Sequence, residues 1–254
     1  MRAETSISTP IAATLTVLLA GLAVSACGAD HKDKAVGTDL PQGSEPVHLN
    51  PADFTTRIDN PYRPMLPGSR RVYRDTDSDG TVQRVVLTVT PRTKKIANGV
   101  QARVVRETVT EDGQIAEDGV DWYAQDSAGN VWYLGELSKE YEDGKVKETS
   151  SWEAGVNGAQ PGIVMPADPR PGVAYRQMYY ARKQEDRGRV VSTGERVESP
   201  AGYFTDAVVI EDSSPLEPKL REFKFFARGV GLVRAFEVAG GSGREELVSY
   251  KKAS

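Results

Sequence analysis

Residues 81–113 read TVQRVVLTVTPRTKKIANGVQARVVRETVTEDG. Two runs rich in Val and Thr, residues 81–90 and 100–110, are separated by Asn98-Gly99 and followed by Asp112-Gly113. Val and Thr favour extended strands, and Gly after Asn or Asp favours the tight turn of a hairpin. The stretch therefore predicts consecutive antiparallel strands.

The same pattern continues on both sides of this stretch. Further turn dipeptides occur at Asp79-Gly80, Asp118-Gly119, Gly129-Asn130 and Asp143-Gly144. No segment keeps a helical apolar period, and the best helix candidate, residues 51–56, is a turn at most. We predict an all-β domain over residues 53–254, an antiparallel meander that forms either a curled sandwich or an open barrel.

Features of the first part of this domain recur about a hundred residues later. Pro67-Gly68 matches Pro171-Gly172, and Val104-Val105 matches Val208-Val209. The domain is then either two duplicated halves, residues 67–150 and 171–250, or one meander whose spacings agree by chance. Residues 152–171, rich in Pro and Gly, are predicted to form an irregular loop that joins the halves and packs over the domain.

The N-terminus has the pattern of an export signal. Residues 11–24 carry no charge and lead into Val24-Ser25-Ala26-Cys27, which looks like a bacterial lipobox. We predict a lipoprotein signal peptide over residues 1–26, with Cys27 lipidated by acyl chains such as palmitate; the alternative is a plain signal peptide with an incidental Cys. Several buried acyl chains anchor a protein stably. The expected location is extracytoplasmic, at the bacterial cell membrane.

Residues 27–52 contain several Gly and Pro without apolar periodicity, which is typical of a flexible tether. The chain has 254 residues, with 32 basic and 36 acidic side chains and a net charge of -4, so no basic surface for nucleic acid is expected. Oligomeric state is left open by these features.

Cys27, His31 and His48 are the whole Cys and His content. Catalytic triads, Cys nucleophiles and His- or Cys-ligated metals are therefore excluded from residues 49–254. Residues 75–80 read DTDSDG, like the start of a calcium loop, but position 86 is Val where that loop needs Glu. We expect an acidic hairpin tip, no metal site and no cofactor.

All three Trp lie within residues 122–152. A hairpin with residue 126 opposite 131 would make both of its faces apolar. One face would meet the core, and the other would be covered by residues 152–171, by a ligand or by a partner. The candidate ligand-binding residues are Trp122, Tyr123, Trp132, Trp152 and Met165.

Carboxylates accompany these aromatic residues. Glycoside hydrolases use two carboxyl groups, one as general acid and one as nucleophile or base. On the predicted hairpin Asp121 and Glu136 are opposite neighbours on the face that carries Tyr123, and Glu153 is a third candidate. Solvated strand ends are the competing interpretation of these acids.

Three further segments carry a family resemblance: IDNPY at residues 58–62, DWYAQD with GNVWY at 121–133, and SWEAG at 151–155 with MPADP at 165–169. Together they resemble a family of functionally uncharacterised bacterial secreted or lipid-anchored proteins, over residues 54–236. The resemblance implies an envelope protein and brings no reaction or catalytic residue with it.

Three hypotheses follow from these patterns. The favoured one is a cell-envelope lipoprotein that binds a small amphiphilic or glycan ligand without catalysis. The second is a carboxylate-dependent hydrolase of envelope glycans. The third is a scaffold or assembly protein that binds another polypeptide at an exposed sheet edge, residues 246–251.

Overall fold

The computed structural model describes residues 40–253. The predicted signal peptide, Cys27 and the first part of the predicted tether lie outside these residues. No helix within the described range is long and apolar enough to cross a membrane. The described part is almost entirely β-structure, as the sequence predicts.

One short 3-10 helix is followed by fourteen strands. Their bounds are η1 Pro51–Asp53, β1 Phe54–Thr55, β2 Arg70–Thr76, β3 Val82–Lys95, β4 Gln101–Glu111, β5 Gln114–Asp126, β6 Val131–Glu142, β7 Lys145–Glu153, β8 Gln160–Met165, β9 Ala174–Tyr180, β10 Gln184–Ser199, β11 Gly202–Ser214, β12 Glu217–Ala227, β13 Gly231–Ala239 and β14 Arg244–Lys251.

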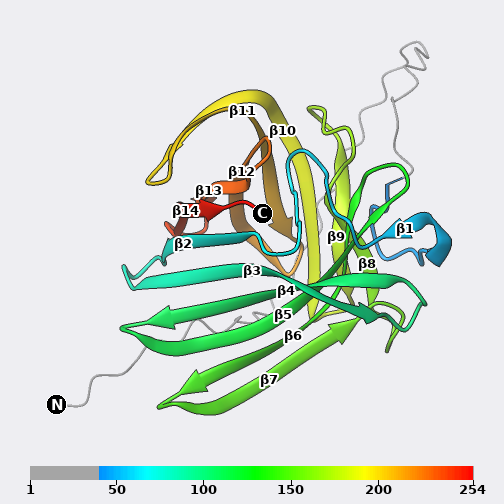
Figure 1. Ribbon diagram of the computed structural model, residues 1–254, viewed down its shortest axis with the longest axis horizontal. Coiled ribbons are helices and arrows are strands. Elements are labelled where there is room, and N and C mark those ends of the chain that lie inside the picture. The colour runs from blue at the N-terminus through cyan, green and yellow to red at the C-terminus, as the bar shows by residue number, and fades with distance from the viewer. Residues whose placement is uncertain (1–39, 254) are drawn as a thin grey trace, which may run out of the picture. The chain divides into compact units, whose positions relative to one another are not determined.

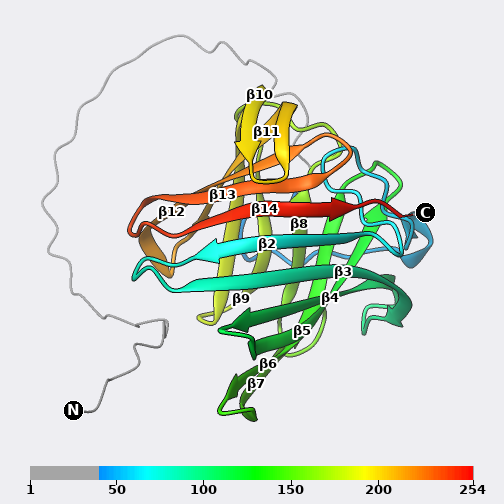
Figure 2. The same cartoon turned by 60° about the vertical axis from the view of Figure 1, so that its left-hand side comes forward.

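Twelve of the strands form an antiparallel barrel, so the barrel alternative is confirmed, although the barrel is closed and not open. From β5 the order runs through β4, β3, β2, β14, β13, β12, β11, β10, β9, β8 and β6, and β6 pairs again with β5. Figure 2 shows β13, β14, β2 and β3 side by side across one wall. Eight strands already suffice to hold core side chains or one small ligand, so twelve enclose a wider interior.

Two strands lie outside the closed ring. β1 pairs with β5, and β7 pairs with β6 where β6 leaves the barrel as a projecting hairpin (Figure 1). The predicted free edge at residues 246–251 is covered only in part: β2 pairs along β14 on one side, whereas β13 pairs only with residues 244–246 on the other. The Leu247 carbonyl also accepts a hydrogen bond from the backbone N–H of Ala201.

Two local predictions also need correction. Asp118-Gly119 is not a turn but lies within β5, where Asp118 accepts hydrogen bonds from Arg106 and Thr108 of β4. The stretch 152–171 is not wholly irregular, since it contains β8. The Asp-Gly pair favours a turn because the Asp side chain can bond to nearby backbone. Here the Asp118 side chain bonds to the neighbouring strand β4 instead, and the chain stays extended.

The two predicted halves have the same strand number and order. β2–β7 form the first meander, β9–β14 the second, and β8 lies between β6 and β9. Gly68 and Gly172 both have a left-handed backbone, with φ of 88° and 89°. Gly68 donates its N–H to the carbonyl of Val89 in β3, and Gly172 donates its N–H to the carbonyl of Val190 in β10. Duplication itself stays a prediction.

Residues 56–69, which include the IDNPY segment, cover one end of the barrel. Asn60 is 2% exposed and donates to the carbonyls of Gly129 and Pro166, in the turns after β5 and β8. Gly229, in the turn after β12, donates to the carbonyl of Pro61. We call residues 56–69 the plug, because it links turns from several sides of the same barrel end.

The seam between β8 and β9 has the fewest paired positions of any neighbouring strands in the barrel wall, namely two. Arg176 of β9 is 1% exposed and donates to the carbonyl of Pro161 at 2.9 and 3.1 Å. It also donates to the carbonyls of Gly43 and Glu45. Residues 40–52 were predicted to be part of a flexible tether; the described part of that tether instead packs along the seam.

Candidate functional site

The inner face of the barrel carries ionisable side chains from both walls. Alternation along the strands and the strand register place these acids on that face: Asp75, Glu107, Asp121, Glu136, Asp186, Asp212, Glu222 and Glu245. They are neither fully buried nor exposed. We call this acid-lined interior the lumen.

Charged groups on different strands of the lumen influence one another's pKa values. Burial raises the pKa of Glu107 on β4 to about 7; Glu117 adds to the rise, and the positive charge of Lys224 on β12 opposes it. Burial likewise raises the pKa of Glu245 on β14 to about 8, with Glu107 contributing. Carboxylates on separate strands therefore share one poorly solvated space.

Tyr133 lies at the centre of one wall of the lumen. Its hydroxyl contacts Asp121 Oδ1 at 2.9 Å and Glu136 Oε2 at 2.5 Å. Burial raises the pKa of Asp121 well above its usual range and also raises the pKa of Glu136, although the bond from Tyr133 opposes both shifts. The hydroxyl has one proton, so both contacts are satisfied when one of the two carboxyl groups is itself protonated and donates.

Aromatic rings flank this hydroxyl. The Tyr123 ring stacks on Tyr133 with centroids 5.0 Å apart, and the Trp152 ring meets Tyr133 edge-on, also at 5.0 Å. The Trp152 indole N–H is buried and has no hydrogen-bond partner among the described residues. We call Asp121, Tyr123, Tyr133, Glu136 and Trp152 the tyrosine cluster.

Arg63 of the plug projects into the lumen from its closed end. Its guanidinium lies 5.6 Å from the ring centroid of Tyr123 and 5.4 Å from that of Phe226, on opposite walls. Its positive charge lowers the pKa values of Glu107 and Asp121, against the larger effect of burial. Within the described chain, Arg63 Nε is buried without a hydrogen-bond partner.

A cavity of about 210 Å³ lies toward the other end of the barrel, between β9 and β12. Lys224 in its wall pairs with Asp212 at 2.7 Å and with Glu222 at 3.0 Å. The full lining is Gln177, Asp186, Asp212, Ser213, Ser214, Glu217, Leu220, Glu222 and Lys224. We call this space the β9–β12 cavity. A second cavity, about 310 Å³, lies beside residues 42–44 and Arg176 at the seam.

Four predicted site residues come together in the tyrosine cluster. Asp121 is paired directly with Glu136, as predicted, and Tyr123 lies on the same face. Trp152, which pairs with Glu136 from β7, completes the group. These four side chains border a polar space, although Tyr123 and Trp152 are only 6% and 5% exposed.

The other predicted site residues do not line the lumen. Trp122 lies on the opposite face of β5, with the Lys94 ammonium 4.0 Å from its ring centroid. Glu153 pairs with that same Lys94 at 2.6 Å, so it does not join Asp121 and Glu136. Trp132 is buried against Phe54 of β1 and donates to Asp126. The predicted concavity, lined by Trp122 or Trp132 together with Tyr123, Trp152 and Met165, is therefore not formed.

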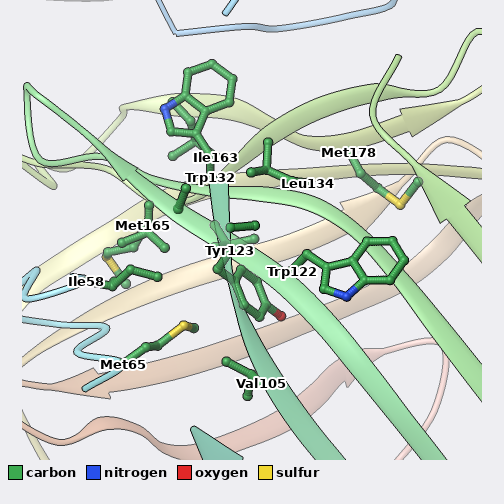
Figure 3. Packing of buried hydrophobic residues seen from close by; sticks show 14 of the residues in the cluster. Ile58, Met65, Val105, Trp122, Tyr123, Trp132, Leu134, Ile163, Met165 and Met178 are labelled. Carbon is green, nitrogen blue, oxygen red and sulfur yellow. The ribbon is translucent and has the colours of Figure 1, made fainter. Parts of the chain in front are cut away.

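Met165 is also part of the core. It is fully buried in the same apolar cluster as Ile58 and Met65 of the plug, and Figure 3 shows these side chains gathered near one another. Neither cavity described above is lined by Trp122, Tyr123, Trp132, Trp152 or Met165. Met165 thus seals the plugged end.

The hairpin register explains why the predicted faces were partly wrong. Asp121 opposes Glu136 as predicted, but Gln125, not residue 126, opposes Val131. A bulge between these pairs shifts the register by one residue and brings Tyr133 beside Tyr123. Gly135 at the bulge has φ of 145°, and a Cβ there would lie 2.5 Å from the Trp152 carbonyl oxygen.

Several functional candidates were missed by the sequence analysis. Tyr133 was assigned to the other face, while Arg63 and Lys224 had no distinctive local pattern. The IDNPY segment was a usable signal for the plug, since a Pro-interrupted segment cannot be a central strand. Across residues 40–253, no three Cys, His, Asp or Glu side chains converge as ligands for a metal ion.

No family model and no curated protein matches this chain. Among solved structures, the chain is similar to a crystal structure described as a "putative lipoprotein" from Parabacteroides distasonis. The TM-score is 0.43 and the sequence identity is 14%, with 76% of this chain and 99% of that chain covered.

Proposed function

We propose that this protein is an extracytoplasmic, lipid-anchored binding protein whose barrel lumen holds a small polar ligand. The observation that carries the proposal is the inward-facing set of acids, tyrosines and Arg63 in a barrel plugged at one end. Buried polar groups in folded proteins nearly always have hydrogen-bond partners. Arg63 Nε and the Trp152 indole N–H lack one among the described residues, which favours a polar occupant.

The lining favours a glycan over an amphiphile. Tyr123, Tyr133 and Trp152 offer aromatic surfaces, and Asp121 and Glu136 beside them accept hydrogen bonds. Rings and carboxylates together suit a hydroxylated ring compound, whereas the apolar surface that an acyl chain needs is packed inside the core. The family resemblance to bacterial secreted or lipid-anchored proteins agrees with such a role.

Ligand binding is tested on the full chain, purified from its bacterial host and analysed by native mass spectrometry. We expect a small molecule to be retained by the native protein and released on denaturation. Replacing both cluster acids (Asp121→Asn with Glu136→Gln) should abolish retention, whereas Glu148→Gln on exposed β7 should not. Equal retention by both variants, or no retained molecule together with no binding of envelope glycan fragments, would refute the proposal.

Anchoring is tested separately through Cys27. We expect the mature chain to begin at Cys27 and to carry the added mass of acyl chains, because a lipobox cysteine receives them on export. Cys27→Ser should move the protein from the membrane fraction to the aqueous fraction. An unmodified thiol in membrane-associated protein would contradict the lipid anchor without affecting the lumen proposal.

Hydrolysis of envelope glycans is the second candidate, favoured by one observation. Asp121 and Glu136 both form hydrogen bonds with the Tyr133 hydroxyl. Both carboxyl groups have raised pKa values, as a general acid requires. It predicts bond cleavage in glycan fragments that disappears in Glu136→Gln and survives in Glu153→Gln. Retention of an intact ligand without products would support binding alone.

A further inference from the structure

The β9–β12 cavity lies apart from the tyrosine cluster and already holds one primary ammonium group. Lys224 is placed between Asp212 and Glu222, and these two carboxylates raise its pKa against the opposing effect of burial. Two more acids, Asp186 and Glu217, line the same cavity. Within the described chain neither of these two forms an ion pair with a Lys or Arg.

A buried hydroxyl is directed toward Asp212 in the wall of this cavity, although Tyr175 itself is not a lining residue. Tyr175 of β9 is 1% exposed, and its hydroxyl has no hydrogen-bond partner among residues 40–253. Its ring lies across Gly188, since a Cβ at Gly188 would be 2.8 Å from the ring carbon that carries the hydroxyl. Gly188 is paired with Tyr175 on one side and with Asp212 on the other. The hydroxyl is therefore directed toward Asp212.

Nearby contacts agree with this direction. Gln177 Nε2 is also 2.8 Å from the same Cβ position and donates to Asp212 Oδ1 at 2.7 Å. The charges of Asp212 and Lys224 both act on the pKa of Tyr175, which burial raises well above its usual value. A buried hydroxyl without a partner is uncommon in a folded protein and indicates a polar group in the adjoining space.

We propose that the β9–β12 cavity binds a small organic cation through a primary ammonium group, held by Asp186 and Glu217 beside Lys224 and beside Asp212, toward which the Tyr175 hydroxyl is directed. This inference rests on the proposed function and names one chemical feature of the ligand. The four lining carboxylates outnumber the single lysine, so a second ammonium balances the local charge. Leu220 offers an apolar contact for the carbon chain of the ligand.

The volume limits the size of the occupant. A cavity needs only about 10–15 Å³ of this kind to hold one water molecule, so about 210 Å³ has room for a short organic molecule. 1,4-Diaminobutane has this size and carries the required ammonium, and 1,4-butanediol is its neutral counterpart. These two molecules differ in charge while keeping nearly the same shape.

The test is calorimetric titration of the full chain with each compound at fixed ionic strength. We expect the diamine to bind at least about tenfold more tightly than the diol, since charge-assisted hydrogen bonds are the stronger ones. Glu217→Gln and Asp186→Asn should each weaken diamine binding several-fold. Tyr175→Phe should weaken it by a smaller factor and leave the diol unaffected.

The matched control is Glu211→Gln, one residue from Asp212 but on the outer face, where Glu211 pairs with Arg189. It should leave diamine affinity unchanged, and thermal unfolding of every variant checks that the barrel is intact. Equal binding of diamine and diol, unchanged affinity in both acid variants, or complete displacement by sodium at matched ionic strength would overturn the inference. A retained ligand that proves neutral would overturn it while leaving the proposed binding function standing.

Discussion

Arg176 shows how a single side chain can link several backbone segments at the seam of a barrel. Its guanidinium is buried at the seam and donates to three backbone carbonyls, those of Gly43, Glu45 and Pro161. Burial lowers its pKa, although the nearby Glu45 charge opposes that effect. The planar group with five donors can reach several acceptors at once, which an ammonium cannot.

Arg176→Lys should therefore destabilise the fold although the charge is kept. We expect a loss of about 2–4 kcal/mol in the free energy of unfolding, because a buried charge is left with fewer partners. Guanidinium chloride titration followed by tryptophan fluorescence measures it. The control is Arg187→Lys on the neighbouring strand, where the side chain is exposed; a similar loss in both variants would contradict the seam interpretation.

Strand β8 illustrates the element scale, because it is short and joins the two meanders. It pairs with β6 over three positions and with β9 over two. Gly162 in β8 lies against the β9 backbone, and a Cβ there would be 2.3 Å from the Arg176 carbonyl oxygen. The close approach of these strands thus depends on a residue without a side chain.

Gly162→Ala should separate β8 from β9. We expect at least about 3 kcal/mol of destabilisation, at the upper end of what overpacking usually costs, because the nearest atoms belong to backbone that cannot rotate away. The control is Gly119→Ala in β5, where the nearest atom would be 3.3 Å away and a small adjustment suffices. Chemical denaturation compares the two, and equal stability would refute this account of the seam.

The lumen produces a pH dependence that belongs to the whole molecule. The pKa values of Glu107 and Glu245 are raised to about 7 and about 8 in the folded state, above the ordinary value of 4.5. At a pH between 4.5 and the raised value, each of these carboxyl groups is protonated in the folded state and ionised in the unfolded state. The folded state therefore binds more protons, and the free energy of unfolding falls as pH rises from about 4.5 to 8. Water in contact with these half-buried groups limits the size of the effect.

Glu245→Gln should reduce the loss of stability with rising pH. Between pH 4.5 and 8 we expect Glu107 and Glu245 each to lower the free energy of unfolding of the wild-type chain by roughly 1–3 kcal/mol, and the variant to lack the contribution of Glu245. Urea unfolding at a series of pH values measures the slope. Glu148→Gln on exposed β7 is the control, and a slope unchanged by Glu245→Gln would show that this carboxyl group is not enclosed as described.

Local residue patterns were sufficient for most of the strands and turns, but not for β8. The Asn98-Gly99 and Asp112-Gly113 pairs form the turns after β3 and β4, because the conformation of a tight turn depends mainly on neighbouring residues. The pairing of Asp121 with Glu136 also followed from a single hairpin. The side of the wall on which Tyr133 lies did not, because one bulged residue reverses every later assignment.

Sequence patterns thus established an all-β meander, its turn positions and one acidic pair, since each depends on contacts between residues close along the chain. Closure of twelve strands, the plug with Arg63 and the meeting of Lys224 with acids from other strands emerged only in three dimensions. These features join residues far apart in the chain, and the alternation of side chains along a strand says which residues share a face but not which face encloses the lumen.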